Sequence, residues 1–207
     1  MTIRHLLAAC LLGAALPAPA ASAQEDGSIS SIYTKLDFQT GCIPLSSDLV
    51  GGSFSCAGHG GYGILFAESD LRQSAFFGYV GDWYGDGAWE SFSPFNQTND
   101  TVEWRLRDGV PFATILRWFI ENPDPETGSP DEAHRGEVLV VSKVGQPGAG
   151  DACVVGYVDA LANPDANAMA REVADTAAEA FTCRTDTPAY HGARGPLAGD
   201  PVQAFGN

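Results

Sequence analysis

The sequence has little positive charge: 11 lysines and arginines stand against 26 aspartates and glutamates, and the formal net charge is −15 at pH 7. A chain this acidic repels nucleic acid and anionic lipid, so we expect neither as a partner. It attracts cationic partners over a Debye length of about 8 Å at physiological salt. The same charge also keeps an exported protein in solution, so by itself it identifies no partner.

Beyond its N-terminus the sequence also lacks a long apolar run. Residues 6–16 are apolar, follow Arg4 and precede a small-residue motif that ends at Ala23, which is typical of a cleaved export signal. No later segment approaches the roughly 20 apolar residues of a membrane-spanning helix. We therefore expect a signal peptide at 1–23 and a soluble mature protein, periplasmic or secreted, without a transmembrane segment.

Cysteine is scarce, and one of the five cysteines lies in the expected signal peptide. An even number of remaining cysteines in an exported chain indicates disulfides, although four cysteines permit three pairings. We expect the pairs Cys42–Cys56 and Cys153–Cys183 because each closes a local loop. In the second pair, a helix that returns over the preceding strand brings the cysteines within the roughly 5.5 Å Cα separation of a disulfide.

The rest of the chain has the pattern of one folded domain. Polar residues 24–32 predict a flexible leader, and the proline- and glycine-rich residues 185–207 predict a disordered tail. A single globular domain is expected at 33–184. Runs of β-type residues bounded by Gly, Pro, Asp and Ser predict its strands. These runs lie at 33–38, 62–67, 74–80, 101–107, 112–120, 137–144 and 152–160.

Asp108-Gly109 separates two of these runs and is a hairpin signal. Pairing Leu106 with Phe112 places one set of apolar side chains on a single face, whereas a one-residue slip would scatter them over both faces. We therefore expect that register. The set consists of Val102, Trp104, Leu106, Phe112, Leu116 and Trp118.

A helix is expected after Asn163-Pro164-Asp165, which supply a cap residue, a proline for the first turn and an acid near the helix N-terminus. Apolar residues recur at helical spacing from Ala166 to Phe181, and the alanines among them let the helix lie close to a sheet. The predicted fold is α+β: a single antiparallel sheet of about six to seven strands, a C-terminal helix packed on it, and two disulfides.

Distinctive short segments are spread along the chain. They are CAGHGGYG (56–63), Asp70-Leu71-Arg72, Glu103-Trp104-Arg105, PFATILRW (111–118) and YVDALANPDANAMAREVAD (157–175). Together they resemble a family of small exported α-proteobacterial proteins that bear signal peptides and have no assigned function. The resemblance covers most of the chain from Tyr33 to Cys183 and implies export and a single domain. It implies no activity, so no functional residue is carried over from it.

In CAGHGGYG, the residues Gly58, Gly60 and Gly63 match the G-x-G-x-x-G pattern of dinucleotide-binding loops. That function requires a helix directly after the motif, but Gly63 leads into a β-type run that begins at Ile64. A turn whose glycines have positive φ angles, anchored by Cys56, fits the stretch better. We therefore expect no nucleotide cofactor.

No complete catalytic set is visible. GGSFS at 51–55 is the nearest approach to the nucleophile motif G-x-S-x-G, and it lacks the second glycine. Cys56 and His59 would form a thiol enzyme only if Cys56 were unpaired, whereas pairing is usual in an oxidising compartment. We expect no catalytic residues, and the alternative is an envelope hydrolase built around His59 from residues distant in sequence.

Metal sites are incomplete as well. Cys56 and His59 form one pair without the second pair that structural zinc needs. The loop 82–87 resembles the start of a calcium loop, but Tyr84 occupies its third ligand position. We expect no metal. A second acidic set, for which a solvated loop is the simpler interpretation, is Asp124, Glu126, Asp131 and Glu132.

Three arginines, Arg72, Arg105 and Arg117, accompany Glu103 in a chain with few basic residues. Their guanidinium groups could bind an anionic group beside aromatic side chains. The alternative is a cross-strand ion-pair cluster in which Glu103 neutralises Arg105 and Arg117. We favour the cluster, because one nearby acid already accounts for the spacing.

These observations predict an exported, non-catalytic envelope protein that binds a ligand or partner, or has a structural role. The expected partner is an envelope protein or small ligand, of cationic character given the charge. A further alternative, based on charge, compartment and disulfides, is an inhibitor of a cationic enzyme such as lysozyme. The candidate ligand-binding residues are Arg72, Arg105, Arg117, His59, Trp83 and Tyr84.

Overall fold

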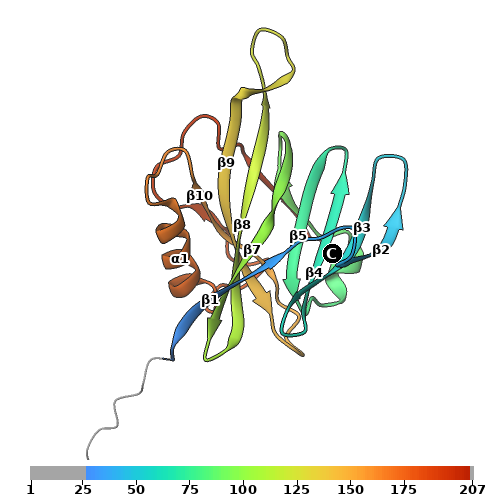
Figure 1. Ribbon diagram of the computed structural model, residues 1–207, viewed down its shortest axis with the longest axis vertical. Helices are drawn as coiled ribbons and strands as arrows, with labels where there is room; N and C mark the ends of the chain where they lie inside the picture. Colours follow the sequence, from blue (N-terminus) through green and yellow to red (C-terminus); the bar gives the residue numbers. More distant parts are fainter. Residues whose placement is uncertain (1–26, 206–207) are drawn as a thin grey trace, which may run out of the picture.

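The computed structural model describes residues 27–205 (Figure 1). The signal peptide expected at 1–23 lies outside these residues. Within them the chain forms a ten-stranded sheet, a separate two-stranded ribbon, one α-helix and a short 3-10 helix, η1 (Asp82–Asp86). None of the helices in this range is long and apolar enough to cross a membrane.

One part of the ten-stranded sheet, here called the long sheet, has the strand order β1-β7-β8-β9-β10-β11. Its neighbours pair antiparallel except β10 and β11, which are parallel. Its strands are β1 (Ile29–Lys35), β7 (Phe95–Arg107), β8 (Val110–Pro123), β9 (Pro130–Gly145), β10 (Cys153–Asp159) and β11 (Ala189–Tyr190).

The other part, here called the short sheet, is an antiparallel meander. It joins the long sheet through a parallel contact in which Phe77 lies opposite Val144 and Gly78 opposite Gly145. The sheet is therefore mixed and has ten strands, so the prediction of six to seven antiparallel strands was wrong in number and type. The strands of the short sheet are β2 (Cys42–Ser47), β3 (Gly51–His59), β4 (Tyr62–Ser69) and β5 (Arg72–Gly78).

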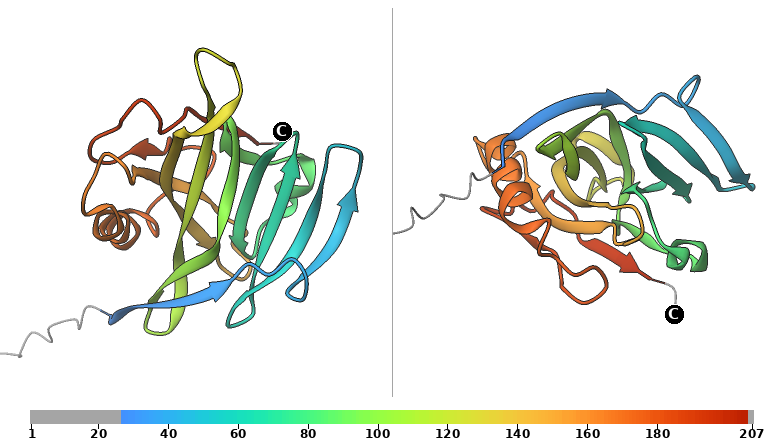
Figure 2. Two further views of the ribbon diagram at one scale, coloured as in Figure 1. Left: turned by 45° about the horizontal axis from the view of Figure 1, so that its top comes forward. Right: turned by 90° about the horizontal axis from the view of Figure 1, so that it is seen from below.

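Side-chain amides connect the two sheets at the opposite end of β5. The backbone N–H of Gln73 donates to Oδ1 of Asn96 (3.0 Å), and the N–H of Thr98 donates to Oε1 of Gln73 (2.6 Å). The Asn96 N–H bonds the Leu71 carbonyl (3.0 Å). These bonds replace a regular ladder between β5 and the start of β7, so the two sheets curve around a common interior (Figure 2, right).

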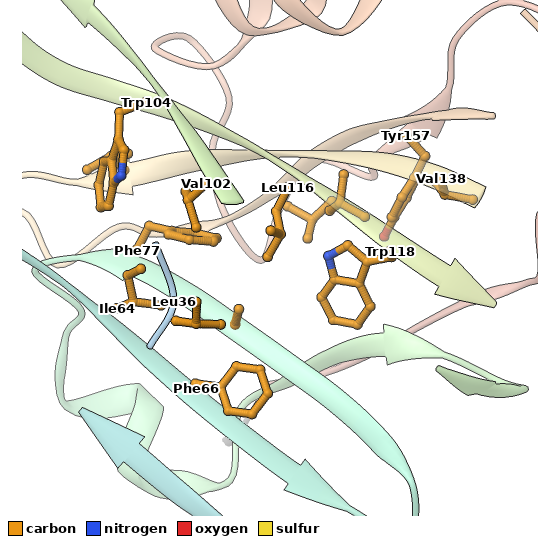
Figure 3. Packing of buried hydrophobic residues seen from close by; sticks show 14 of the residues in the cluster. Leu36, Ile64, Phe66, Phe77, Val102, Trp104, Leu116, Trp118, Val138 and Tyr157 are labelled. Atoms are coloured by element: carbon orange, nitrogen blue, oxygen red, sulfur yellow. The ribbon is translucent and has the colours of Figure 1, made fainter. Parts of the chain in front are cut away.

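The main hydrophobic core fills this interior (Figure 3). Trp104 and Leu116 of the long sheet face Ile64 and Phe77 of the short sheet, and the rings of Phe77 and Trp104 meet edge to face at 5.9 Å. The position of the Trp104 ring requires that residue 58 be glycine, because a Cβ atom on Gly58 would lie 2.6 Å from that ring. Close packing between the sheets therefore depends on this position.

Helix α1 (Ala166–Ala177) covers the outer face of the long sheet (Figure 1). Its buried alanines Ala166 and Ala170 let it pack closely on Ile115 and Val141, which form part of a second apolar cluster. The Asn163 side chain does not cap the helix. Its amide instead donates to the Asp159 and Ala193 carbonyls, and its Oδ1 accepts the Ala193 N–H. Asn163 therefore ties the segment that follows α1 to the loop that precedes it.

The predicted hairpin at Asp108-Gly109 forms, and both residues have positive φ angles, 51° and 82°. Trp104 pairs with Thr114 as the expected register requires, but the register shifts by one residue next to the turn. Phe112 is the extra residue of this bulge and packs on the helix side. The expectation that it shares a face with Trp104 was therefore wrong, because the bulge turns it to the opposite face.

Both predicted disulfides are present. Cys42 and Cys56 lie opposite each other on β2 and β3, with Cα atoms 3.9 Å apart. Cys153 and Cys183 join β10 to the segment after α1, with Cα atoms 5.7 Å apart. The first bridge fixes β2 to β3, and the second fixes the segment after α1 to β10.

Parts of the expected leader and tail belong to the fold. β1 begins at Ile29 and pairs with β7 along its whole length. In the expected tail, Tyr190 packs on Tyr157 with ring centroids 5.2 Å apart, and β12 (Pro201–Ala204) pairs with β6 (Trp89–Phe92). These contacts supply burial that proline and glycine content alone does not predict.

Candidate functional site

The CAGHGGYG stretch is a β-hairpin. His59 pairs with Tyr62 across a two-residue turn, and Gly60 and Gly61 have φ angles of 59° and 88°. Because β4 follows directly and no helix does, the phosphate-binding geometry of a dinucleotide loop does not form. His59 is half-buried, and among residues 27–205 no hydrogen bond or ion pair to its ring is found. The turn interpretation is confirmed.

The arginines singled out in the sequence do not converge. Arg117 pairs with Glu137 at 2.6 Å, while Arg72 pairs with Asp70 at 2.7 Å and lies over the Phe95 ring. The structure therefore does not assemble the anion-binding set, and the favoured cluster in which Glu103 neutralises both Arg105 and Arg117 was wrong for Arg117, because Glu137 is its partner.

Arg105 and Glu103 instead belong to a line of ion pairs between β7 and α1, here called the α1 seam. Arg105 Nε donates to Asp175 at 2.9 Å, and Arg171 Nε donates to Glu103 at 2.6 Å. Burial raises the pKa of Glu103, but hydrogen bonds from Arg171 and Ser31 outweigh burial and lower it below its usual value. Every charge in the seam has a partner.

The η1 segment holds the two aromatic candidates. Tyr84 packs edge to face on Phe76 with ring centroids 5.4 Å apart, and burial raises its pKa. The side chains of Trp83 and Asp86 lie outside the described part of the chain. Tyr84 therefore contributes to packing between η1 and β5.

The β8–β9 hairpin brings together three groups with metal-ligand atoms: Asp124, Asp131 and His134, within 4.8 Å of one another. Asp131 Oδ1 accepts the His134 N–H at 2.9 Å and lies 2.8 Å from His134 Nδ1. The side-chain hydrogen bond with His134 is the main cause of the lowered pKa of Asp131. These hydrogen bonds explain the cluster, and Glu126 and Glu132, the other two members of the acidic set in the sequence, are not part of it.

A hollow of about 520 Å³ lies where the β7–β8 turn meets the end of β9. Four charged groups of its rim pair with one another: Lys143 donates to Asp151 at 3.2 Å and to the Phe181 carbonyl at 2.7 Å, and Arg107 pairs with Glu179 at 2.8 Å. The carboxylate of Asp108 accepts the Ser28 N–H at 3.0 Å. With these groups already bonded, the hollow offers a ligand mainly an apolar floor.

Two smaller hollows adjoin each other and share Glu68 and Gln73; we call them together the acidic groove. One has a volume of about 360 Å³ and the other about 300 Å³. The first is lined by Phe38, Ser47, Gly51, Gly52, Phe54 and Phe66, and the second by Leu71, Phe95, Asn96, Gln97, Glu121 and Pro130.

The two carboxylates of the acidic groove are not neutralised. Glu68 accepts a hydrogen bond from the Gln73 amide at 2.9 Å, and Glu121 accepts one from the Gln97 amide at 3.1 Å. No lysine, arginine or histidine within 27–205 forms an ion pair with either. Arg135 lies opposite Glu121 in the β8–β9 ladder and pairs with Glu132, and the Arg72 guanidinium lies over the Phe95 ring and pairs with Asp70. The two groove carboxylates are therefore left without an ion-pair partner among the described residues.

The other end of the groove is aromatic. The ring of Phe38 lies 4.7 Å from that of Phe66 and 5.6 Å from that of Phe54, both edge to face. Phe38 remains 45% exposed. Gly51 packs so tightly on β4 that a Cβ would lie 1.8 Å from the Glu68 carbonyl oxygen, so no side chain can occupy this point. The result is an apolar hollow directly beside a carboxylate.

Sequence reasoning did not identify the acidic groove. Glu68 and Glu121 come from β4 and β8 and are far apart in the chain, and neither belongs to a motif. Alternation along β4 does place Glu68 on the same face as Phe66, but the position of β8 beside that face follows only from the fold. The candidates His59, Arg105 and Arg117 do not line the groove.

The fold and groove define a disulfide-bonded, two-layered β protein with an outer helix and a charged aromatic groove. No family model, no curated protein and no solved structure matches the chain. The similarity to exported α-proteobacterial proteins therefore stays a prediction.

Proposed function

We propose that this protein is a non-catalytic binding protein of the cell envelope or extracellular space, and that its acidic groove binds a cationic, partly apolar partner. The observation that carries the proposal is the pair of carboxylates, Glu68 and Glu121, without a basic partner beside an aromatic hollow. Two disulfides are consistent with an oxidising location outside the cytoplasm.

The chemistry of the groove favours an amphipathic cation over a simple one. A lysine or arginine about 4 Å from a carboxylate gains about 1 kcal/mol in bulk water and several times more near a protein surface. An apolar side chain that enters the hollow formed by Phe38, Phe54 and Phe66 adds about 25 cal/mol per Å² of apolar surface removed from water. A segment with a basic residue next to an apolar residue combines both terms.

A labelled peptide of alternating leucine and lysine is a suitable probe, and one of alternating leucine and glutamate is the control. We expect the first alone to bind, with an affinity that falls as salt is raised. The double variant Glu68→Gln, Glu121→Gln should bind at least tenfold more weakly.

A matched control removes two charges elsewhere. Asp165 and Glu172 are exposed, and neither side chain has an ion-pair partner among the described residues. The variant Asp165→Asn, Glu172→Gln should bind within about twofold of the parent, since it changes only the overall field. Equal weakening by both double variants would show that the total charge, and not the groove, attracts the peptide.

A second candidate is inhibition of a cationic enzyme. The β8–β9 hairpin projects from the body beside the groove, and its tip carries Asp124, Glu126, Asp131 and Glu132 (Figure 1). A projecting acidic hairpin next to an acidic groove suits a basic cleft on a partner enzyme. Lysozyme activity measured with increasing amounts of the protein tests this candidate, and unchanged activity at a large excess would eliminate lysozyme as the target.

A further inference from the structure

A carboxyl group lies in the interior, away from the acidic groove. Glu90, on β6, is 2% exposed. Its Oε2 accepts the backbone N–H of Val154 on β10 at 2.8 Å, and its Oε1 accepts the side-chain amide of Gln203 on β12 at 2.7 Å. Its own N–H donates to Ser74 Oγ on β5 at 3.1 Å. Through its side chain and its backbone N–H, this one residue connects four strands.

The position of Glu90 follows from an irregularity in β10. The β9–β10 ladder shifts register between Val154 and Gly156, and the Glu90 carboxyl group receives the Val154 N–H at this interruption. A buried donor without a partner would cost about 1–3 kcal/mol, so the carboxyl group has a structural role there. This role does not require a negative charge, because a neutral carboxyl or amide oxygen accepts the same bond.

Strand β12 is the least anchored neighbour of Glu90. It has four residues, none of them charged, and β6 is its strand partner within residues 27–205. Gln203 is its side-chain link to the interior. Short elements with one partner open at lower free energy than central strands, so departure of β12 is the easiest way for water to reach Glu90.

No lysine, arginine or histidine within residues 27–205 forms an ion pair with Glu90. On β10, Tyr157 faces Glu90, and burial and the Glu90 charge raise the pKa of Tyr157. Asp159, also on β10, accepts hydrogen bonds from the Leu161 and Gly195 N–H groups. On β5, Arg72 pairs with Asp70. Burial is the main cause that raises the pKa of Glu90 to about 7, and the bonds from Val154 and Gln203 offset it in part.

We propose that Glu90 is a pH-responsive latch for β12: the neutral carboxyl group keeps the strand seated on β6, and ionisation favours a locally open form in which the strand leaves and water reaches the carboxylate. In the closed neutral form, the proton on Oε1 is donated to the Gln203 side-chain oxygen after its amide turns over, and Oε2 still accepts from Val154. On opening, the proton is released to water.

The size of the effect follows from linkage. The pKa is about 7 in the closed form and takes the ordinary value of 4.5 when water reaches the group, a difference of 7 − 4.5 = 2.5 units. The opening constant should be flat below the lower value, rise about tenfold per pH unit between the two, and level off above 7. The total increase is about 300-fold.

Amide hydrogen exchange tests the latch, with protection factors measured at pH 5, 6, 7 and 8 to remove the intrinsic pH dependence of exchange. The amides of Val202, Gln203 and Ala204 should lose protection steeply from pH 5 to 7 and little from pH 7 to 8. Core amides such as those of Leu116 and Val140, which are exposed only by global unfolding, should stay far more protected than those of β12 at every pH. In Glu90→Gln, which keeps both hydrogen bonds without a charge, β12 protection should be independent of pH.

A matched control, Glu126→Gln, removes an exposed carboxylate at the β8–β9 turn and should retain the parent pH dependence. Constant protection of β12 in the parent protein would overturn the latch, and this measurement needs no variant to fold. Protection factors of β12 equal to those of the core at every pH would also overturn it, since the strand would then open only on global unfolding. The same pH dependence in Glu90→Gln would assign the effect to another group.

Discussion

Glu103 on β7 and Glu68 on β4 are both partly buried carboxylates, but their surroundings differ. Glu103 accepts hydrogen bonds from Arg171 and Ser31 and lies 3.9 Å from Arg105. Glu68 accepts one hydrogen bond, from a neutral amide. In the α1 seam the protein pairs its charges and so fixes the helix, whereas the carboxylates of the acidic groove have no ion-pair partner within residues 27–205 and are available to an external cation. Charge that serves folding and charge available for binding are therefore separated in space.

The largest effect is expected where the seam is most buried. Glu103→Gln should lower the free energy of unfolding by about 2–4 kcal/mol, because Arg171 and Arg105 lose a charged acceptor. Urea denaturation at pH 7 measures it. A loss below about 0.5 kcal/mol would remove the distinction between seam and groove.

The same variant has an expected pH signature. Because the folded pKa of Glu103 lies below the ordinary 4.5, its stabilisation is complete above that pH and is lost as the pH falls through the lowered value. Glu103→Gln should therefore cost less at pH 3 than at pH 7. An equal cost at both pH values would indicate that packing, not charge, explains the effect.

A smaller effect is expected from the helix side of the seam. Arg171 is partly exposed, so Arg171→Ala should lower the free energy of unfolding by about 1–2 kcal/mol. The neighbouring Glu172→Gln is the control and should have an effect within about 0.5 kcal/mol. Thermal melts of the two variants compare them directly. If both melt like the parent, the pairing of Glu103 with Arg171 does not stabilise the helix contact.

Arg117→Ala probes an ion pair outside both regions. The Arg117 and Glu137 side chains are partly exposed, and pairs of this kind contribute about 0–1 kcal/mol. We expect a loss in that range and unchanged peptide binding. Loss of peptide binding with an unchanged melting temperature would instead place this face of the long sheet in the binding site.

The smallest effect on stability is expected in the groove. Glu68→Gln should change the free energy of unfolding by at most about 0.5 kcal/mol, because the carboxylate has no basic partner to lose. Binding of the leucine–lysine peptide should weaken in the same variant. A loss of stability comparable to that of Glu103→Gln would show that Glu68 is a folding residue.

Local chemistry explains which parts of the fold could be predicted. Asp108-Gly109 and Gly60-Gly61 form two-residue turns because these residues accept positive φ angles. The disulfides were predictable because each joins residues that the local strand and helix order brings close. The Cys153–Cys183 bridge, in particular, required only that the helix return over β10.

Two kinds of element were missed: strands whose own sequence is poor in β-type residues, and strands whose partner lies far along the chain. β3 has the sequence GGSFSCAGH, which is poor in β-type residues, and it is a strand because β2 and β4 pair with it on both sides. β12 likewise depends on β6. The displacement of Phe112 follows from one inserted residue beside a turn, which alternation along the strand does not reveal.

The sequence by itself determined the acidic charge, the cysteine pairing, the glycine turns and the helix, because each depends on composition or on residues close in the chain. The tertiary structure alone decided which acids are neutralised. Glu103 gains Arg171 as a partner because α1 packs against β7. Glu68 and Glu121 share a groove because β5 joins the two sheets. Glu90 accepts the Gln203 amide because β12 pairs with β6. The electrostatic state of a carboxylate depends on neighbours within a few ångströms, and here those neighbours come from distant parts of the chain.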